Sequence, residues 1–485
     1  MNIDSLQIKI SLVENIPLDI STVFIINSLE NLHSYSISPD EVAYIKHKAS
    51  LGTFSISLNL VFPFRYVIYI EKPETKPNLI EHIRGLANKI SDETKHQELD
   101  KICIVNTTGE AGMSQHVAES IFLSMYQFLV HKSDKSKQNK LNEIILVSHD
   151  ITKAQAQWLH ELVRSVYIVR NLVNQPYSHL NTEIFADAIL SLCSLENVSI
   201  ENFDKTKIES LRMGGLLSVN KGSNNPPVFS VVEYKPLSHL NVKPIVLVGK
   251  GVVYDTGGLG LKPTTNSMDY MKCDMAGAAV VVGLLRAIAT LKLPIYVVGI
   301  MPITDNLIGP EAYAPGDVIT ISDGTTVEVM HTDAEGRLIL ADALHYAKKY
   351  SPELVIDFAT LTGAAMRAIG KHGTVGFRTC TDEQFAALCK AGNNVYERIV
   401  EFPLWDEYKD EIKSDIADIK NLGGENAGAT TAAKFLQHFT DYPWVHFDIA
   451  GPAYVFSHDS YRGKFATGVG VRMVMEFLKI NYNLN

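Results

Sequence analysis

At residues Met330–Leu338 the chain reads MHTDAEGRL, which places two carboxylates and a guanidinium at alternate positions with a small residue between each pair. The preceding segment, Thr325–Met330, alternates like a β-strand, and Arg337–Lys349 repeats its apolar residues at helical spacing. The sequence therefore predicts a strand-to-helix loop that carries three charged groups. In an α/β sheet such a loop lies at the carboxyl edge of the strand, where ligands usually bind.

The two carboxylates of this loop, Asp333 and Glu335, favour a bound cation. Carboxylates held close together in a crevice repel each other unless a cation or a proton lies between them. The simpler interpretation is a solvated helix N-terminus, with Asp333 as its N-cap and Glu335 in the first turn. A second acidic cluster upstream makes the cation-binding interpretation the stronger one.

That second cluster follows a predicted strand at Pro244–Val248 and continues through the glycine-rich segment GKGVVYDTGGLGLKP, residues 249–263. The spacings of a P-loop and of a dinucleotide-binding loop are absent, so a phosphate cradle is not indicated. A predicted helix, Ala276–Leu291, begins with four small residues and can approach a neighbouring backbone closely. An N-cap role is the simpler alternative for the aspartate before this helix. The charged residues of the cluster are Lys250, Asp255, Lys262 and Asp274.

Four carboxylates gathered at strand ends would destabilise one another without metal. Two divalent ions bridged by carboxylates remove that repulsion, and a shell of mostly oxygen ligands suits magnesium, manganese or zinc. A lysine beside such ions can lose its proton and bind through its nitrogen, because the cations lower its pKa. The residues themselves thus predict a dinuclear metal hydrolase.

The whole chain has the composition of an ordinary globular enzyme. Its 485 residues carry a formal charge of -10, which argues against a general affinity for nucleic acid or anionic membrane. The five cysteines are scattered and form no C-x-x-C pair, as expected of reduced thiols in a cytoplasmic protein. The N-terminus lacks the pattern of a signal peptide, and we expect no transmembrane helix.

Strand and helix patterns alternate along the chain and predict an α/β protein of two domains. We expect a smaller N-terminal α/β domain over residues 1–170, including a linker helix at about 151–174. We expect a larger catalytic domain over residues 175–485, with a mixed central sheet flanked by helices. The strands predicted in the first domain are Gln7–Val13, Thr22–Ile26, Arg65–Tyr69, Lys101–Val105 and Glu143–Val147, with a helix at Gln115–Val130.

The chain closely resembles the leucyl (cytosol) aminopeptidase family of dinuclear metallopeptidases. The family signature N-T-D-A-E-G-R-L appears as HTDAEGRL at His331–Leu338, and further blocks occur in the family's order throughout the second domain. Among these blocks are VGKGVVYDTGG (248–258), DYMKCDMAGAA (269–279), DFATLTGA (357–364) and WVHFDIAGPA (444–453). The N-terminal domain shows no matching motif, so the resemblance extends to it only by size.

The resemblance implies a role for each matching residue. Lys262 and Arg337 match the two catalytic positions. One metal ion would be bound by Asp255, Asp333 and Glu335, and the other by Lys250, Asp255, Asp274 and Glu335. Met271, Thr360 and Gly363 match positions that line the pocket for the first side chain of the substrate.

The implied function is a hydrolase that releases N-terminal residues, leucine and other apolar residues among them, from peptides with a free N-terminus. A water or hydroxide bridging two manganese or zinc ions would attack the first peptide bond. Lys262 would stabilise the oxyanion, and a bicarbonate ion near Arg337 would act as the base. The family's active form implies a homo-hexamer in the cytoplasm.

Two departures from the family pattern concern residues near this site. His331 replaces the signature's asparagine, and we expect it to form hydrogen bonds rather than bind metal. The interval from Lys262 to Asp274 is one residue longer than in the family, and the extra residue falls within Thr264–Met268. Cys273 is expected to be a packed residue and not a nucleophile.

Two other functions compete with the aminopeptidase interpretation. A dinuclear phosphoesterase would also use carboxylates and basic residues, but the ligands here stand in peptidase-like blocks. A DNA-binding member of the same family is the other alternative, and the acidic balance of the chain argues against it.

Overall fold

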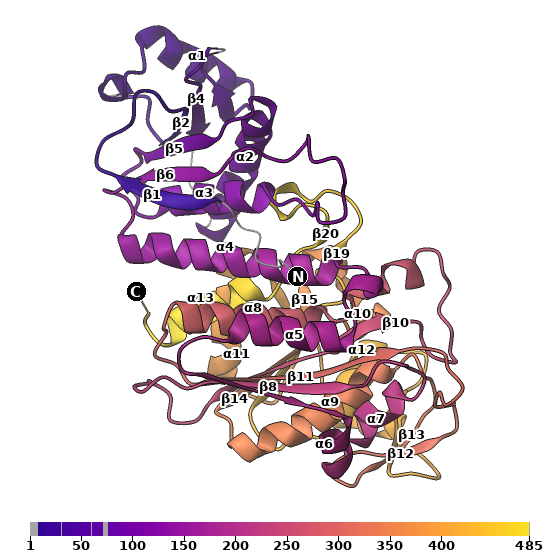
Figure 1. Cartoon of the computed structure of the whole chain (residues 1–485). Coiled ribbons are helices and arrows are strands. Elements are labelled where there is room, and N and C mark those ends of the chain that lie inside the picture. Colours follow the sequence, from indigo (N-terminus) through magenta and orange to yellow (C-terminus); the bar gives the residue numbers. More distant parts are fainter. Residues whose placement is uncertain (1–7, 31, 60, 71–75, 485) are drawn as a thin grey trace. The chain divides into compact units, whose positions relative to one another are not determined.

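The computed structural model describes residues 8–30, 32–59, 61–70 and 76–484. These residues form two compact units, drawn with their elements in Figure 1. The N-terminal unit contains the described residues up to Arg164 together with Ser457–Lys464, and the C-terminal unit contains the rest from Ser165 to Leu484. The division falls inside helix α4 (Lys153–Asn174), which the sequence predicts as a long helix over 151–174.

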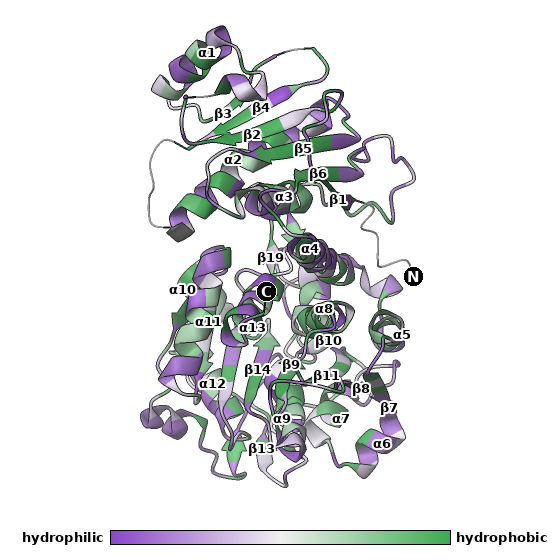
Figure 2. Cartoon of the chain, turned by 90° about the vertical axis from the view of Figure 1, so that its left-hand side faces the viewer, coloured by the Kyte–Doolittle hydropathy of each residue, from purple (hydrophilic) through white to green (hydrophobic). Residues whose placement is uncertain are grey.

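The N-terminal unit is built on a sheet whose described strands follow the order β1-β6-β5-β2-β4-β3. All neighbouring strands are parallel except β3, which is antiparallel to β4. Strands β2, β5 and β6 are almost wholly apolar, as Figure 2 shows, which is typical of buried parallel strands. The elements are β1 (Lys9–Val13), β2 (Thr22–Ile26), α1 (Pro39–Ser50), β3 (Ser55–Ser57), β4 (Arg65–Tyr69), α2 (Lys76–His96), β5 (Lys101–Asn106), α3 (Met113–Ser124) and β6 (Glu143–Val147).

The strands predicted in this unit are present, and three of them match to the residue. Strand β1 begins at Lys9, while the predicted start, Gln7, lies outside the described residues. The predicted helix Gln115–Val130 is too long, because α3 ends at Ser124. Past that end, Asn139 Nδ2 donates to the Met125 carbonyl oxygen at 2.7 Å. A loop side chain thus provides the hydrogen bond that this carbonyl would accept from a backbone N–H in a longer helix.

The segment Ser457–Lys464 belongs to the N-terminal unit although it lies close to the end of the chain. Glu81 on α2 holds it: Tyr461 Oη donates to Glu81 Oε2 and Arg462 Nη2 donates to Glu81 Oε1, each at 2.7 Å. A segment far from the N-terminal domain in sequence therefore completes that unit.

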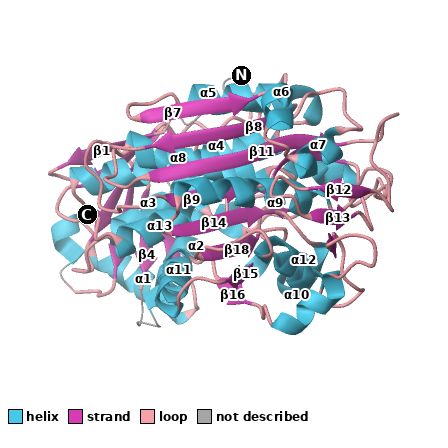
Figure 3. Cartoon of the chain, turned by 90° about the horizontal axis from the view of Figure 1, so that it is seen from below, coloured by secondary structure: helices cyan, strands magenta, loops and turns pink. Residues whose placement is uncertain are grey.

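The C-terminal unit contains a mixed sheet, whose described strands run in the order β16-β15-β18-β14-β9-β11-β8-β7 (Figure 3), with β10 paired to the end of β11. The central strands β18, β14, β9 and β11 are parallel, and the antiparallel strands lie outside them. The mixed α/β fold predicted from sequence is thus confirmed. The strands are β7 (Val198–Phe203), β8 (Val228–Tyr234), β9 (Ile245–Gly249), β10 (Gly251–Asp255), β11 (Val297–Asn306), β14 (Leu354–Ala359), β15 (Thr374–Arg378), β16 (Ile399–Glu401) and β18 (Trp444–Asp448).

Helices cover both faces of this sheet. Helix α8 packs on β9, β11 and β14 with α5 and α13 beside it, while α7 and α9 pack on the opposite face of β11, as Figure 2 shows. This three-layer arrangement buries the central strands on both sides. The helices are α5 (Thr182–Cys193), α6 (Lys205–Ser210), α7 (Gly214–Asn220), α8 (Ala276–Thr290), α9 (Glu335–Ala347), α10 (Gly363–Ile369), α11 (Asp382–Val395), α12 (Gly428–Gln437) and α13 (Val471–Asn481).

The start of α8 lies against the backbone of the central strands, as its small residues predict. A Cβ atom on Gly277 would lie 2.0 Å from the Phe358 carbonyl oxygen, and one on Gly249 would lie 2.5 Å from Ala278 Cα. Backbone atoms cannot move aside as a flexible side chain can, so both positions require glycine. The segment Met268–Thr290 is long and apolar enough to cross a membrane, but 94% of its most apolar window is buried inside the structure.

One sequence expectation about the MHTDAEGRL loop is wrong. The strand before it, β13 (Thr326–Glu328), pairs with β12 (Val318–Thr320) and β17 (Ile419–Lys420) in a small separate sheet, not in the central one. A three-residue strand carries too little pattern to reveal which sheet it joins.

Candidate active site

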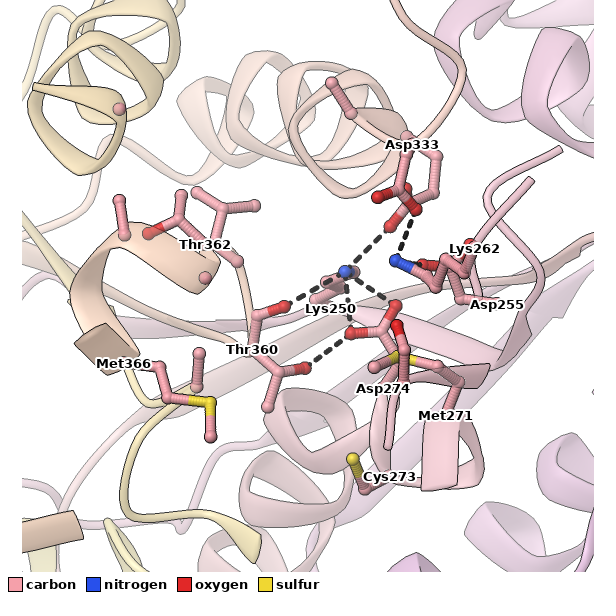
Figure 4. Close-up of a pocket in the computed structure, with 18 of the residues that line it drawn as sticks. Lys250, Asp255, Lys262, Met271, Cys273, Asp274, Asp333, Thr360, Thr362 and Met366 are labelled. Atoms are coloured by element: carbon pink, nitrogen blue, oxygen red, sulfur yellow. Dashed lines mark hydrogen bonds and ion pairs between the residues drawn. The ribbon is translucent and has the colours of Figure 1, made fainter. Parts of the chain in front are cut away.

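The site is assembled at the carboxyl ends of the central strands. Lys250 directly follows β9, Asp255 ends β10, and Thr360 directly follows β14. Asp274 lies in the turn before α8, and Glu335 is the first residue of α9. Figure 4 shows several of these side chains converging from separate elements on one cavity.

Lys250 is the centre of one half of the site. Its Nζ lies 2.7 Å from Asp274 Oδ2 and 2.8 Å from Glu335 Oε1, and it donates to the Thr360 carbonyl oxygen at 3.1 Å. The Thr360 hydroxyl donates to Asp274 Oδ1 at 2.7 Å. All three charged side chains are buried. Burial by itself would lower the pKa of Lys250, but Asp274, Glu335 and Asp255 together raise it above its ordinary value.

Lys262 is the centre of the other half. Its Nζ lies 2.8 Å from Asp255 Oδ2 and also contacts Asp333 Oδ1. Asp255 is oriented through its other oxygen, Oδ1, which accepts from the backbone N–H of Gly257 and from Asn306 Nδ2, each at 2.8 Å. Burial and the neighbouring Asp255 and Glu335 raise the pKa of Asp333 to about 7.

The carboxylates are close enough to share a cation. One oxygen from each of Asp255, Asp333 and Glu335 can be chosen so that all three lie within 4.8 Å of one another. Burial opposes ionisation of Glu335, but Lys250 and Lys262 lower its pKa to about 2. Its Oε2 atom is buried and has no hydrogen-bond partner among the described residues. A carboxylate oxygen in that state fits a metal ligand, because an unmet buried acceptor is otherwise costly.

The simpler interpretations of these carboxylates are wrong. The N-cap residues of α8 and α9 are Met275 and Ala334, and neither helix has a side-chain cap hydrogen bond. Asp274 and Asp333 instead face the lysines. Glu335 does stand in the first turn of α9, but it is 2% exposed and is not solvated.

Arg337 is buried at the same end of the sheet. Its Nη1 donates to the Asn421 carbonyl oxygen at 2.7 Å, and its Nε has no hydrogen-bond partner among the described residues. Burial lowers the pKa of Arg337 to about 10, so the side chain remains a cation near neutral pH. Among the described residues it forms no ion pair, and its hydrogen bond goes to a neutral carbonyl oxygen, which argues against a structural salt bridge as its role.

His331 supports the loop through its ring and its backbone. The backbone N–H of Asp333 donates to His331 Nδ1 at 3.0 Å, and Asn421 Nδ2 donates to the His331 carbonyl oxygen at 2.9 Å. A bond from a backbone N–H to the side chain two residues earlier is the pattern of an asparagine turn, so His331 Nδ1 occupies the place of an asparagine oxygen. The expectation that His331 forms hydrogen bonds is consistent with this geometry.

We therefore expect His331→Asn to keep kcat/KM for a leucyl substrate within about twofold, since the acceptor is retained. His331→Leu should lower it about tenfold, because the unpaired N–H of Asp333 costs roughly 1–3 kcal/mol and loosens a proposed ligand. Steady-state kinetics of both metal-loaded variants tests this. An equal loss in the two variants would show that the imidazole itself is needed.

Residues that the sequence analysis did not single out hold this loop in place. Asn306 Nδ2 and Tyr313 Oη both donate to the Thr332 carbonyl oxygen, at 3.0 and 2.7 Å, and Asn421 Oδ1 accepts from the Met330 N–H at 2.7 Å. These partners are 19 to 91 positions away in sequence, so no local pattern could have identified them.

The cavity beside the charged cluster has a volume of about 740 Å³. Met271, Thr360 and Gly363, the positions that the resemblance assigns to the substrate pocket, all line it. Cys273 also lines it, and burial raises the pKa of its thiol to about 12, so it stays protonated and is not poised as a nucleophile. Further lining residues that sequence reasoning missed include Tyr270, Met366, Arg367, Tyr454 and Phe456.

This fold and this arrangement of charges are typical of one class of protein, the metallohydrolases of mixed α/β fold whose metal-binding side chains lie at the carboxyl ends of parallel strands. Within that class the chain belongs to the cytosol aminopeptidase family, because the model of the family's catalytic domain matches residues 167–475. The family predicted from the sequence is confirmed.

Known relatives agree with this assignment. The chain is 51% identical over 314 residues to a protein named "Probable cytosol aminopeptidase" from Chlorobaculum tepidum, an alignment that spans 64% of this chain and 61% of the relative. A protein of the same name from Chloroherpeton thalassium is 43% identical over 387 residues, or 76% of this chain and 75% of that protein.

Solved structures are similar to this chain over nearly its whole length. A structure of the bottromycin maturation enzyme BotP in complex with Mn has a TM-score of 0.82 and 27% identity, and covers 96% of this chain and 100% of that chain. A variant of tomato leucine aminopeptidase has a TM-score of 0.83 and 27% identity, and covers 97% of this chain and 96% of that chain. None of these matches favours the phosphoesterase or the DNA-binding alternative.

Proposed function

We propose that this protein is a metal-dependent aminopeptidase that removes leucine and other apolar residues from the N-terminus of peptides. The observation that carries the proposal is the meeting of Asp255, Asp333 and Glu335 within 4.8 Å beside the buried Lys250 and the partly buried Lys262. Membership of the cytosol aminopeptidase family supports the choice of a peptide bond as the target.

Two divalent metal ions fit the ligands present. Asp255, Asp333 and Glu335 would bind one ion, and Lys250, Asp255, Asp274 and Glu335 would bind the other, so that Asp255 and Glu335 bridge. The contacts of Lys250 with Asp274 and Glu335 support the second set. Such ions, when bound, acidify a water molecule and polarise the scissile carbonyl. We infer manganese or zinc from the oxygen-rich ligand set.

Lys262 and Arg337 would be the two catalytic residues. Asp255, Glu335 and Asp333 raise the pKa of Lys262 although burial opposes this, so it remains an ammonium group. It is 13% exposed and can donate to the oxygen that becomes negative as the peptide carbonyl is attacked. Arg337 would hold a bicarbonate ion that accepts a proton, and its buried Nε, which no described residue pairs with, supports an anion there.

The first side chain of the peptide would lie against Met271, Thr360 and Gly363. Met271 supplies an apolar surface, and Gly363 leaves room for the substrate. We infer further that residues 175–485 are the catalytic domain and that the active form is a homo-hexamer. We also infer that the protein works in the cytoplasm, as the name of the family suggests.

Hydrolysis of leucine p-nitroanilide by metal-stripped protein, with and without added manganese or zinc, tests the proposal. We expect activity only when metal is added. N-acetyl-leucine p-nitroanilide should not be cleaved, because an aminopeptidase needs a free amino group. Cleavage of bis-p-nitrophenyl phosphate in place of the leucine substrate would refute the proposal.

A further inference from the structure

Helix α10 (Gly363–Ile369) brings a charged residue to the substrate cavity. The helix is fixed at its start, since the Thr362 hydroxyl accepts from the Ala365 N–H at 3.0 Å and donates to the buried Asp448 at 2.7 Å. Figure 4 shows Thr362 and Met366 on the side of the cavity away from Asp333 and Lys262. The wall formed by α10 is therefore separate from the charged cluster.

Arg367 lies one helical turn after Gly363 and shares its face of α10. Both residues line the cavity, and a Cβ atom on Gly363 would lie 3.0 Å from Arg367 Nη1. The guanidinium thus lies over the glycine, within contact distance of the space that a side chain at this position would enter. This is the part of the cavity that the proposed function assigns to the first side chain of the substrate.

The charge of Arg367 has no counter-ion within the described part of the chain. Its side chain is exposed, and it forms no hydrogen bond or ion pair with another described residue. Arg337, in contrast, is buried and bonded to Asn421. Each carboxylate of the cluster contacts Lys250 or Lys262, and among the described residues none of them contacts Arg367, so the guanidinium at the cavity wall keeps its donors for a ligand.

A guanidinium with free donors has a defined chemical complement. It presents planar N–H groups that pair with both oxygens of a carboxylate, and this pairing is stronger where solvent access is reduced. Its aliphatic stem can still cover apolar surface, so the same wall can accept leucine. A substrate carboxylate beside Gly363 would accept hydrogen bonds from the Arg367 guanidinium.

We propose that Arg367 is a specificity residue that recognises a substrate carboxylate, and that this aminopeptidase therefore also accepts peptides beginning with glutamate or aspartate. The inference rests on the proposed function. The place of Arg367 beside Gly363 favours the carboxylate of the first side chain. The free C-terminus of a dipeptide presents the same chemistry, and the experiment separates the two sources.

The test compares ratios of kcat/KM in wild type, Arg367→Met, Arg367→Lys and Lys390→Met, all loaded with manganese. Lys390 is an exposed cation on α11 outside the cavity and is the matched control. The first ratio is glutamyl to leucyl p-nitroanilide, and the second is Leu-Gly to Leu-Gly-amide. A ratio within one enzyme cancels differences in the amount of active protein, so partial misfolding cannot imitate the effect.

We expect Arg367→Met to lower the glutamyl-to-leucyl ratio about fivefold, the upper range for an exposed charge pair. The glutamyl-to-leucyl ratio of Arg367→Lys should lie between those of wild type and Arg367→Met, and the ratio of Lys390→Met should equal that of wild type. A fall confined to the dipeptide ratio would support carboxylate recognition at the C-terminus of the substrate instead. If both ratios stay unchanged, Arg367 does not recognise a carboxylate. Failure of the wild type to cleave the leucyl substrate would refute the proposed function itself.

Discussion

Glu335→Gln is expected to lower kcat/KM for leucine p-nitroanilide by about 10³-fold. The expected loss is large because a bridging carboxylate serves both proposed ions, and each ion supplies several kcal/mol of charge stabilisation. Glutamine keeps the size of the side chain but not its charge. One oxygen of Glu335 contacts Lys250, and the other is buried with no hydrogen-bond partner in the described structure, so the substitution removes the group that the site leaves free for metal.

Metal content distinguishes this cause from simple misfolding. Elemental analysis of Glu335→Gln after dialysis should show fewer than two bound ions per chain, while wild type retains two. Glu383→Gln is the matched control, because Glu383 is an exposed glutamate in the first turn of α11. Two tightly bound ions and full activity in Glu335→Gln would contradict the assignment of Glu335 as a ligand.

Lys250→Met should destabilise the metal-free protein by about 3–5 kcal/mol. Its ammonium lies 2.7 Å from Asp274 and 2.8 Å from Glu335, and all three side chains are buried. Removing one partner of a buried ion pair leaves uncompensated charge in a medium of low dielectric constant, which is the costly case. Methionine roughly preserves the volume, so the change reports charge more than packing.

Urea unfolding in the presence of a chelator measures this effect, and added metal should reduce the difference from wild type because bound cations neutralise the same carboxylates. Lys292→Met is the matched control. Lys292 pairs with Glu196 at 2.7 Å, but both side chains are about 70% exposed, and such a pair contributes only about 0–1 kcal/mol. Equal destabilisation of the two variants in chelator would show that Lys250 does not neutralise the cluster.

The sequence of the second domain predicts function better than that of the first. The sequence of the first domain predicts the bounds of its strands more accurately. MHTDAEGRL and the glycine-rich segment 249–263 carry their chemistry in short runs of sequence, so the family followed from them. The N-terminal strands β2, β4 and β6 are short apolar runs with clear ends, and they match the prediction to the residue. No motif in that unit indicated what it does.

The sequence by itself determined the kinds of group in the site, because a carboxylate pair, a lysine after a strand and a glycine-rich turn are local features. Only the tertiary structure decided which of them meet. It brings Lys250 to Asp274 and Glu335, places β13 outside the central sheet, and sets the Arg367 guanidinium beside Gly363 with no partner from the described part of the chain. Contacts between residues tens of positions apart depend on which helices and strands pack against one another, and the periodic pattern of an element shows its buried face but not its partner.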